Sequence, residues 1–265
     1  MDESLRRRLA NIGIEAGAYF DPFDVWVRLR AAEGPRVSLI DLYALAADRR
    51  GVHLDELPAE ERDRLSVRGL GVMFQGFEII PGTDRPVRDP VEIVPYDDSW
   101  PTLYDAWSHR LSSALGPIAK RIEHIGSTAV SGLPAKPVID IQVSVDDLKD
   151  ESRYVPAIES LGVQLRSRDD EHRYFRPFSG RPRDVQIHIC AIGSRWERVH
   201  LLFRDYLRAD AAARLSYTES KREAAARWRG DRIAYTDAKS RMILNLIDAA
   251  EAWANHTGWH LASTV

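Results

Sequence analysis

The sequence of 265 residues contains a single cysteine, Cys190, and no run of about 18 consecutive apolar residues. One cysteine excludes an intrachain disulfide and every zinc motif that needs several cysteines, and it is typical of a reducing compartment. The N-terminus carries basic residues but no apolar core of signal-peptide length. We therefore expect a cytoplasmic protein that neither spans a membrane nor is exported.

The chain also lacks a strong excess of charge of either sign. Its 37 basic and 40 acidic side chains give a formal net charge of -3. Without a general positive field, nucleic acid is an unlikely partner unless a local patch binds it. The eight histidines show no metal-ligand spacing such as HExxH, and no Walker sequence or internal repeat is present. A hydrophobic content of 44% is nevertheless enough for one large or two modest cores.

Residues 1–90 are predicted to form a small, mainly helical module that ends in a linker. Short amphipathic stretches, each with a capping residue or proline at its start and a glycine at its stop, are expected to be helices at 21–34, 38–51 and 57–69. A strand-like segment at 72–80 precedes the proline-rich linker at 81–90. The favoured interpretation is that the module closes only its own core; the alternatives are that it recruits a partner protein or covers the acceptor side of the cleft.

Residues 91–265 show the mixed pattern of strands and helices that is typical of a second domain. Alternating or short apolar runs predict strands at 91–94, 118–125, 137–145, 172–178 and 184–192. Amphipathic periodicity predicts helices at 97–116 and 153–161, and a nearly all-helical end at 196–210, 211–228 and 235–254.

Polar side chains alternate with apolar ones along two of these strands. In VIDIQVSV the polar positions are Asp140, Gln142 and Ser144, and in DVQIHICAI they include Asp184 and His188. A carboxylate against a dry core would need a partner, so the two polar rows are predicted to face one cavity. The alternative is a half-exposed sheet, which carries polar residues on its wet face routinely.

The segment HIGSTAVSGLPAKPVIDIQ, residues 124–142, has the parts of a phosphate site. Gly126 permits a sharp turn, Ser127 and Thr128 offer hydroxyl groups, and Lys136 adds a positive charge. Glycine-serine-threonine is common in ordinary turns. The distance of thirteen residues from Ser127 to the strand residue Asp140 is more specific. It is similar to the pattern of the DNA polymerase beta-like nucleotidyltransferase superfamily.

Over about residues 91–250 the chain resembles the GrpB family of nucleotidyltransferase-like proteins. The segments that carry the resemblance follow one another in this order: YDDSWPTLYDAW, IEHIGSTAVSGLPAKPVIDIQV, GSRWERVHLLFRDYLRAD and YTDAKSRMI. The resemblance implies an α+β fold with a mixed sheet flanked by helices, a nucleotide-phosphate loop at Gly126 and Ser127, and a metal-facing Asp140. Our leading hypothesis is metal-dependent transfer of a nucleotidyl group from a nucleoside triphosphate to a small-molecule acceptor. The alternative is a non-catalytic module that binds a nucleotide or phosphate.

The sequence departs from the superfamily pattern at the expected metal site. Active nucleotidyltransferases pair two strand carboxylates to hold two Mg²⁺ ions, whereas the second position here is Gln142. A further ligand could be Asp184, but the family resemblance points to His188. A site of Asp140, Gln142 and His188 would hold one divalent cation, and the histidine favours Mn²⁺ over Mg²⁺.

Asp140, His188 and Lys136 are therefore the predicted catalytic residues. Basic residues outside the loop are further candidates for binding phosphate, namely His124, Arg173, Arg204 and Lys239. The ordinary alternatives are a surface ion pair for an arginine such as Arg204 and a solvated side chain for Lys239.

Overall fold

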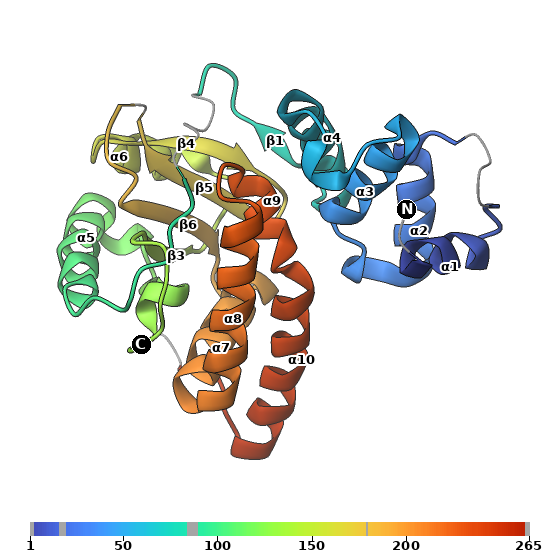
Figure 1. Ribbon diagram of the computed structural model, residues 1–265. Helices are drawn as coiled ribbons and strands as arrows, with labels where there is room; N and C mark the ends of the chain where they lie inside the picture. Colours follow the sequence, from blue (N-terminus) through green and yellow to red (C-terminus); the bar gives the residue numbers. More distant parts are fainter. Residues whose placement is uncertain (1–2, 16–19, 84–89, 179, 263–265) are drawn as a thin grey trace.

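The computed structural model describes residues 3–15, 20–83, 90–178 and 180–262. In this part of the chain a six-stranded mixed sheet has helices on both faces and a helical N-terminal module at one end (Figure 1). The predicted α+β class, with a mixed sheet, flanking helices and N-terminal helices, is confirmed.

The N-terminal module consists of four helices and reaches the sheet through a two-residue strand. The elements are α1 (Glu3–Asn11), α2 (Pro22–Glu33), α3 (Leu39–Arg50), α4 (Ala59–Met73) and β1 (Glu78–Ile79). The sequence signals for helix ends are used as expected in α2 and α3, whereas α4 continues past the predicted stop Gly69, which packs against Leu39, and ends at Met73. The Asp21 side chain accepts hydrogen bonds from two backbone N–H groups at the start of α2, and Gly51 ends α3 in the left-handed conformation.

The apolar stripes of the module close a core that it shares with two helices from the other end of the chain. Trp26 and Tyr43 are completely buried and belong to the same cluster as Trp228 and Tyr235. Asp237 fixes this contact, because its carboxylate accepts hydrogen bonds from the first backbone N–H groups of α3, at 2.7 and 3.0 Å. The module is therefore packed against the C-terminal helices.

The sheet has the strand order β1-β4-β5-β6-β3-β2. Its remaining strands are β2 (Arg121–Ile125), β3 (Ile139–Val145), β4 (Val163–Arg168), β5 (His172–Pro177) and β6 (Val185–Ala191). The central pair β3 and β6 is parallel, and the other neighbours are antiparallel. In the register of the central pair, Asp140 lies beside Gln186 and Gln142 beside His188. The two predicted polar rows therefore do share one face.

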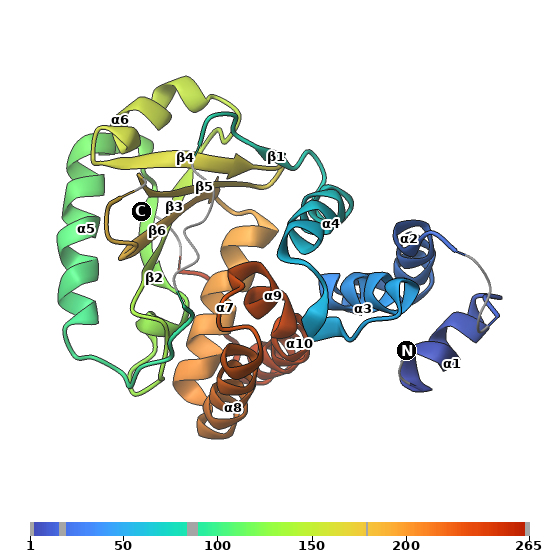
Figure 2. The same cartoon turned by 45° about the horizontal axis from the view of Figure 1, so that its top comes forward.

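The two faces of the sheet are covered differently (Figure 2). The apolar face packs against α5 (Trp100–Leu115) and α6 (Val155–Glu159), with Ile141, Val143, Ile187 and Ile189 completely buried. On the polar face lie α7 (Arg195–Ala209) and the helices α8 (Ala211–Arg227), α9 (Arg232–Ala238) and α10 (Ser240–Thr257). Because α7 covers part of this face, Gln142, Ser144 and Cys190 are fully buried beneath it.

Some element boundaries differ from the sequence predictions. Strand β4 was not predicted, the strand expected at 91–94 is a single bridge between Val94 and Ala135, and the C-terminal helix is interrupted at Lys239. Residues 84–89 of the predicted linker lie outside the described residues, so the domain division at residue 90 stays a prediction. Across the described ranges, none of the helices combines the length and the apolar character that crossing a membrane would require.

Candidate functional site

The loop between β2 and β3 is held tightly against the start of β3. Gly126 has a φ of +71°, and a Cβ atom on it would collide with Oδ2 of Asp140. Both the left-handed backbone and the close carboxylate therefore require glycine. Ser127 follows at the start of a short 3-10 segment, Ser127–Ala129. The predicted phosphate loop and the predicted strand carboxylate are thus in contact.

Three lysines from distant parts of the chain meet near this loop. Nζ of Lys221, on α8, lies 3.3 Å from Oγ of Ser127 and also donates to the carbonyl of Pro134. The Nζ atoms of Lys136 and Lys239 lie 4.9 and 4.2 Å from the ring centroid of Tyr235. Lys221 and Lys239 are only 1% and 8% exposed. Within the described residues, none of the three lysines forms an ion pair with a carboxylate.

The surroundings of these lysines lower their pKa values. Burial lowers the pKa of Lys221 to about 7. Burial, together with repulsion from Lys136 and Lys221, also lowers the pKa of Lys239 to about 7. Burial lowers the pKa of Lys136 as well, although Asp140 opposes the shift. A bound anion would reverse these effects, because it stabilises the charged form of each amine.

A row of imidazole and carboxylate groups crosses the polar face next to Asp140. Nε2 of His188 lies 3.6 Å from Oδ1 of Asp140, and its Nδ1 lies 2.9 Å from Nε2 of His172. Nδ1 of His172 is in turn 3.8 Å from Oδ2 of Asp169. Burial lowers the pKa of His172 to about 4, so this ring is neutral near neutral pH. The ring of Trp196 stacks on that of His172, with centroids 4.8 Å apart.

The other two predicted metal ligands differ in position. Gln142 shares the face of Asp140, but its side chain is completely buried, and neither its amide oxygen nor its nitrogen has a hydrogen-bond partner among the described residues. Asp184 is exposed and precedes β6. The described ranges contain no group of three or more His, Cys, Asp or Glu side chains arranged to hold a metal ion.

His124 and Thr128 support the loop from inside the protein. The His124 ring stacks on Tyr104 of α5, on the apolar side of the sheet, with centroids 4.8 Å apart. Its Nε2 lies 3.0 Å from Oγ1 of Thr128, which donates to the carbonyl of Val138. Burial lowers the pKa of His124 to about 4. These two predicted phosphate ligands are therefore occupied in holding the loop to β3.

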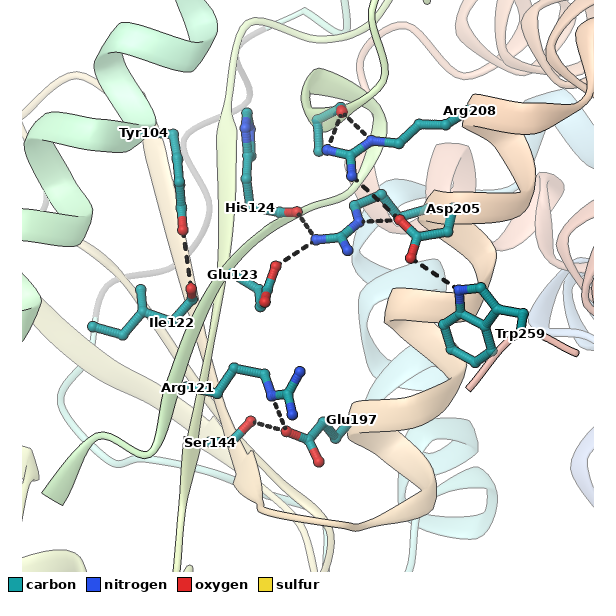
Figure 3. Close-up of polar contacts among 12 residues, drawn as sticks. Tyr104, Arg121, Ile122, Glu123, His124, Ser144, Glu197, Asp205, Arg208 and Trp259 are labelled. Carbon is teal, nitrogen blue, oxygen red and sulfur yellow. Dashed lines mark hydrogen bonds and ion pairs between the residues drawn. The ribbon is translucent and has the colours of Figure 1, made fainter. Parts of the chain in front are cut away.

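The two arginines predicted to bind phosphate form ion pairs within the protein. Arg173 points to the apolar side of the sheet and pairs with Glu151 at 2.5 Å. Arg204 pairs with Glu123 at 2.7 Å and Asp205 at 2.8 Å, and it donates to the carbonyl of His124. Figure 3 shows this network, in which α7 is fastened to β2. Burial lowers the pKa of Arg204, but its hydrogen bonds with Asp205 and Glu123 outweigh that effect and raise it.

A cavity of about 740 Å³ extends from Lys136 and His188 across the polar face of β5 and β6. Its floor is formed by strand residues that include Tyr174 and Arg176, and Trp196 and His200 of α7 form one wall. Residues of α9 and of the N-terminal module complete the lining. The module therefore forms part of the cavity lining, and its predicted place on the acceptor side stays a prediction.

The principal residue missed by sequence reasoning is Lys221. The segment SYTESKREAAAR has the composition of a solvated helix, and no motif marks the lysine. Its spacing was the available signal, because Lys221 lies four residues after Tyr217 and three before Ala224 on the buried stripe of α8. A lysine in a core position of an amphipathic helix indicates a buried amine.

Comparison with known proteins identifies the family. The sequence model described as GrpB protein matches residues 90–249, so the chain belongs to the GrpB family. The chain is 38% identical over 176 residues to the UPF0157 protein BH1888 of Halalkalibacterium halodurans, covering 66% of this chain and 90% of that protein. The family predicted from the sequence is confirmed.

Two further proteins are similar to this chain. The crystal structure of the conserved protein GrpB from Enterococcus faecalis superposes with a TM-score of 0.55 and 26% identity, over 61% of this chain and 99% of that one. A protein of Mycolicibacterium paratuberculosis named dephospho-CoA kinase is 32% identical over 203 residues, covering 67% of this chain but only 50% of the kinase. The N-terminal module lies outside the family match.

Proposed function

We propose that the protein binds a nucleoside triphosphate beside Ser127 and transfers its nucleotidyl group to a small-molecule acceptor. The observation that carries the proposal is the cluster of Lys136, Lys221 and Lys239, which lacks a carboxylate partner in the described part of the chain. Burying a cation is costly unless an anion compensates it. The cluster therefore supports a ligand with several negative charges, and a triphosphate is such a ligand.

In this proposal each group near the loop has a distinct task. The three lysines neutralise the phosphate oxygens and the charge that develops on the departing pyrophosphate. Gly126 lets the loop approach Asp140 without a clash. The acceptor supplies its own hydroxyl, amine or carboxylate as the attacking group, so the protein needs no nucleophilic side chain.

Asp140 and His188 would hold one divalent cation, either Mg²⁺ or Mn²⁺. Their nearest side-chain atoms are 3.6 Å apart, and the unpartnered amide oxygen of Gln142 is a third donor on the same face. A single strand carboxylate fits one cation and not the usual two. When bound, the cation would neutralise phosphate charge.

His172 and Asp169 would set the protonation of His188. A carboxylate only accepts hydrogen bonds, so Asp169 favours a proton on Nδ1 of His172. Nε2 of His172 then accepts from Nδ1 of His188, which leaves the Nε2 lone pair of His188 on the side of Asp140. That tautomer is the one that can bind a cation.

The second candidate function is a non-catalytic module that binds a nucleotide or another polyphosphate. It is favoured by Gln142, which stands where a catalyst of this superfamily has its second carboxylate. The lysine cluster serves this function equally well. A binder would keep its affinity without Asp140, whereas a catalyst requires Asp140 for turnover.

The test is thermal stabilisation and calorimetric binding of the four common nucleoside triphosphates, with Mg²⁺ or Mn²⁺, for wild type, Asp140→Asn and the control Asp184→Asn. The catalytic proposal expects metal-dependent binding that is lost in Asp140→Asn and kept in Asp184→Asn. Metal-independent binding that survives Asp140→Asn would favour the binding module. Absence of binding by every triphosphate to the wild type would overturn the catalytic proposal and the nucleotide-binding form of the module.

A further inference from the structure

The N-terminal module gives the cavity an apolar wall of its own. Five residues from the end of α4 to β1 line the cavity: Leu70, Met73, Phe74, Phe77 and Ile79. They face a floor and wall that contain rings of the family domain, including Tyr174 and Trp196. The cavity lining thus combines charged side chains, Lys136 among them, with an apolar and aromatic wall. The wall lies before residue 90, where the family match begins.

The backbone of this wall is held in place by hydrogen bonds, although the Phe74 side chain at its centre is exposed to solvent. Phe74 is 45% exposed, and its backbone N–H donates to the carbonyl of Leu70 at the end of α4. The following turn is tied to the sheet, because the N–H of Asp170 donates to the carbonyl of Gln75 at 3.0 Å. Gly76 has a φ of +70°, and a Cβ atom there would collide with Oδ1 of Asp170. The Phe74 ring is therefore held at the cavity by a tightly packed turn.

We propose that this wall binds the nucleobase of the bound nucleotide. The proposal rests on the proposed function, since it requires the phosphates to lie at the lysine cluster. Lys136 is the member of the cluster that lines the cavity, whose lining also includes His188, Trp196 and Phe74, so a nucleoside attached to phosphates at Lys136 can extend toward these rings. A planar base has two faces that can stack on aromatic side chains, and an exposed phenylalanine gains from covering its surface.

The experiment compares nucleoside triphosphates with inorganic tripolyphosphate, which carries the charge without the base. Affinities are measured by calorimetry with Mg²⁺ for wild type, Phe74→Ala and the control Leu103→Ala. Leu103 is 47% exposed on α5 and does not line the cavity, so the control removes a similarly exposed apolar side chain. Phe74→Tyr keeps the ring and serves as the conservative variant.

The proposal expects Phe74→Ala to weaken the best-bound triphosphate about tenfold, the loss of one stacking contact, and to leave tripolyphosphate unchanged. Leu103→Ala and Phe74→Tyr should bind both ligands like the wild type. Equal weakening of both ligands, or no weakening of the nucleotide, overturns the base-binding wall. If the wild type binds tripolyphosphate but no nucleotide more tightly, the wall fails and the anion site stands. If neither ligand binds, the proposed function fails as well.

Discussion

The structure contains two kinds of buried or largely buried cation. Arg204 and Arg173 are matched by carboxylates of the protein, and in Arg204 the pairing raises the pKa despite burial. Lys221 and Lys239 have no such partner among the described residues, and burial lowers the pKa of each to about 7. A buried positive charge is therefore not by itself a sign of ligand binding. A cation already paired within the protein holds the fold together, whereas one without a protein anion is available to a ligand.

The largest expected effect on stability comes from replacing a cation that is paired with carboxylates of the protein. Arg204→Met should reduce the free energy of unfolding by about 3 kcal/mol, because Glu123 loses its ion-pair partner and Asp205 keeps only Arg208 and Trp259. The matched control is Arg198→Met on the same helix, where the pair with Glu251 is 40% and 39% exposed. A surface pair of that kind contributes less than about 1 kcal/mol. Urea denaturation of both variants checks the difference, and similar losses would contradict it.

Replacing a buried lysine that has no carboxylate partner in the described residues should have the opposite effect, a loss of ligand affinity without a loss of stability. Lys221→Met is expected to weaken tripolyphosphate binding by about 2 kcal/mol, roughly thirtyfold, because it removes a charged donor. The same change should leave the ligand-free protein equally stable or more so, since a buried cation is lost. Lys149→Met removes an exposed lysine and is the control for net charge. A strongly destabilised Lys221→Met with unchanged affinity would show that the amine is structural.

A smaller effect should appear in the pH dependence of binding. The pKa of Lys221 and Lys239 is about 7 in the folded protein, against an ordinary 10.5. Above pH 7.5 the ligand-free site has therefore lost protons that a bound polyanion restores. Tripolyphosphate affinity should fall between pH 7.5 and 8.5, by up to about tenfold per pH unit for each lysine that takes up a proton on binding. Calorimetry in buffers of different ionisation enthalpy measures that uptake, and proton release would contradict the assignment.

The same lowered pKa values fix how stability depends on pH without ligand. Between pH 7 and 10.5 the unfolded chain binds more protons at these lysines than the folded protein does. Their contribution to the free energy of unfolding therefore rises with pH across that window. Lys221→Met should reduce this slope, which thermal unfolding at several pH values would detect.

The sequence was sufficient for the fold class, because apolar periodicity and helix-end signals agree with the final packing. Strand β4 escaped prediction for a local reason. Its pairing with β5 shifts register between Leu165 and Ser167, so the alternation is interrupted and the segment ends in polar residues. The opposite error concerns residues 91–94, a short apolar run that was predicted to be a strand but forms a single bridge, between Val94 and Ala135.

The candidate site was predictable only where neighbours in sequence are neighbours in space. Gly126, Ser127 and Asp140 meet as expected, because a short loop joins their strands. His124 and Arg173 lie on the other side of the sheet, and strand alternation applied to each of them would have indicated this. The pairing of Arg204 with Glu123 and the approach of Lys221 to Ser127 depend on how helices dock, which no local pattern records.

The two-residue strand β1 has a consequence for the rest of the sheet. It pairs with Ser167 and Arg168 and so covers the end of the outer edge of β4, whose backbone would otherwise offer unpaired hydrogen-bonding groups to a second chain. A version of this protein cut back to the family region would expose that edge together with the buried faces of α8 and α9. Removal of the module is therefore expected to promote self-association of the remaining domain.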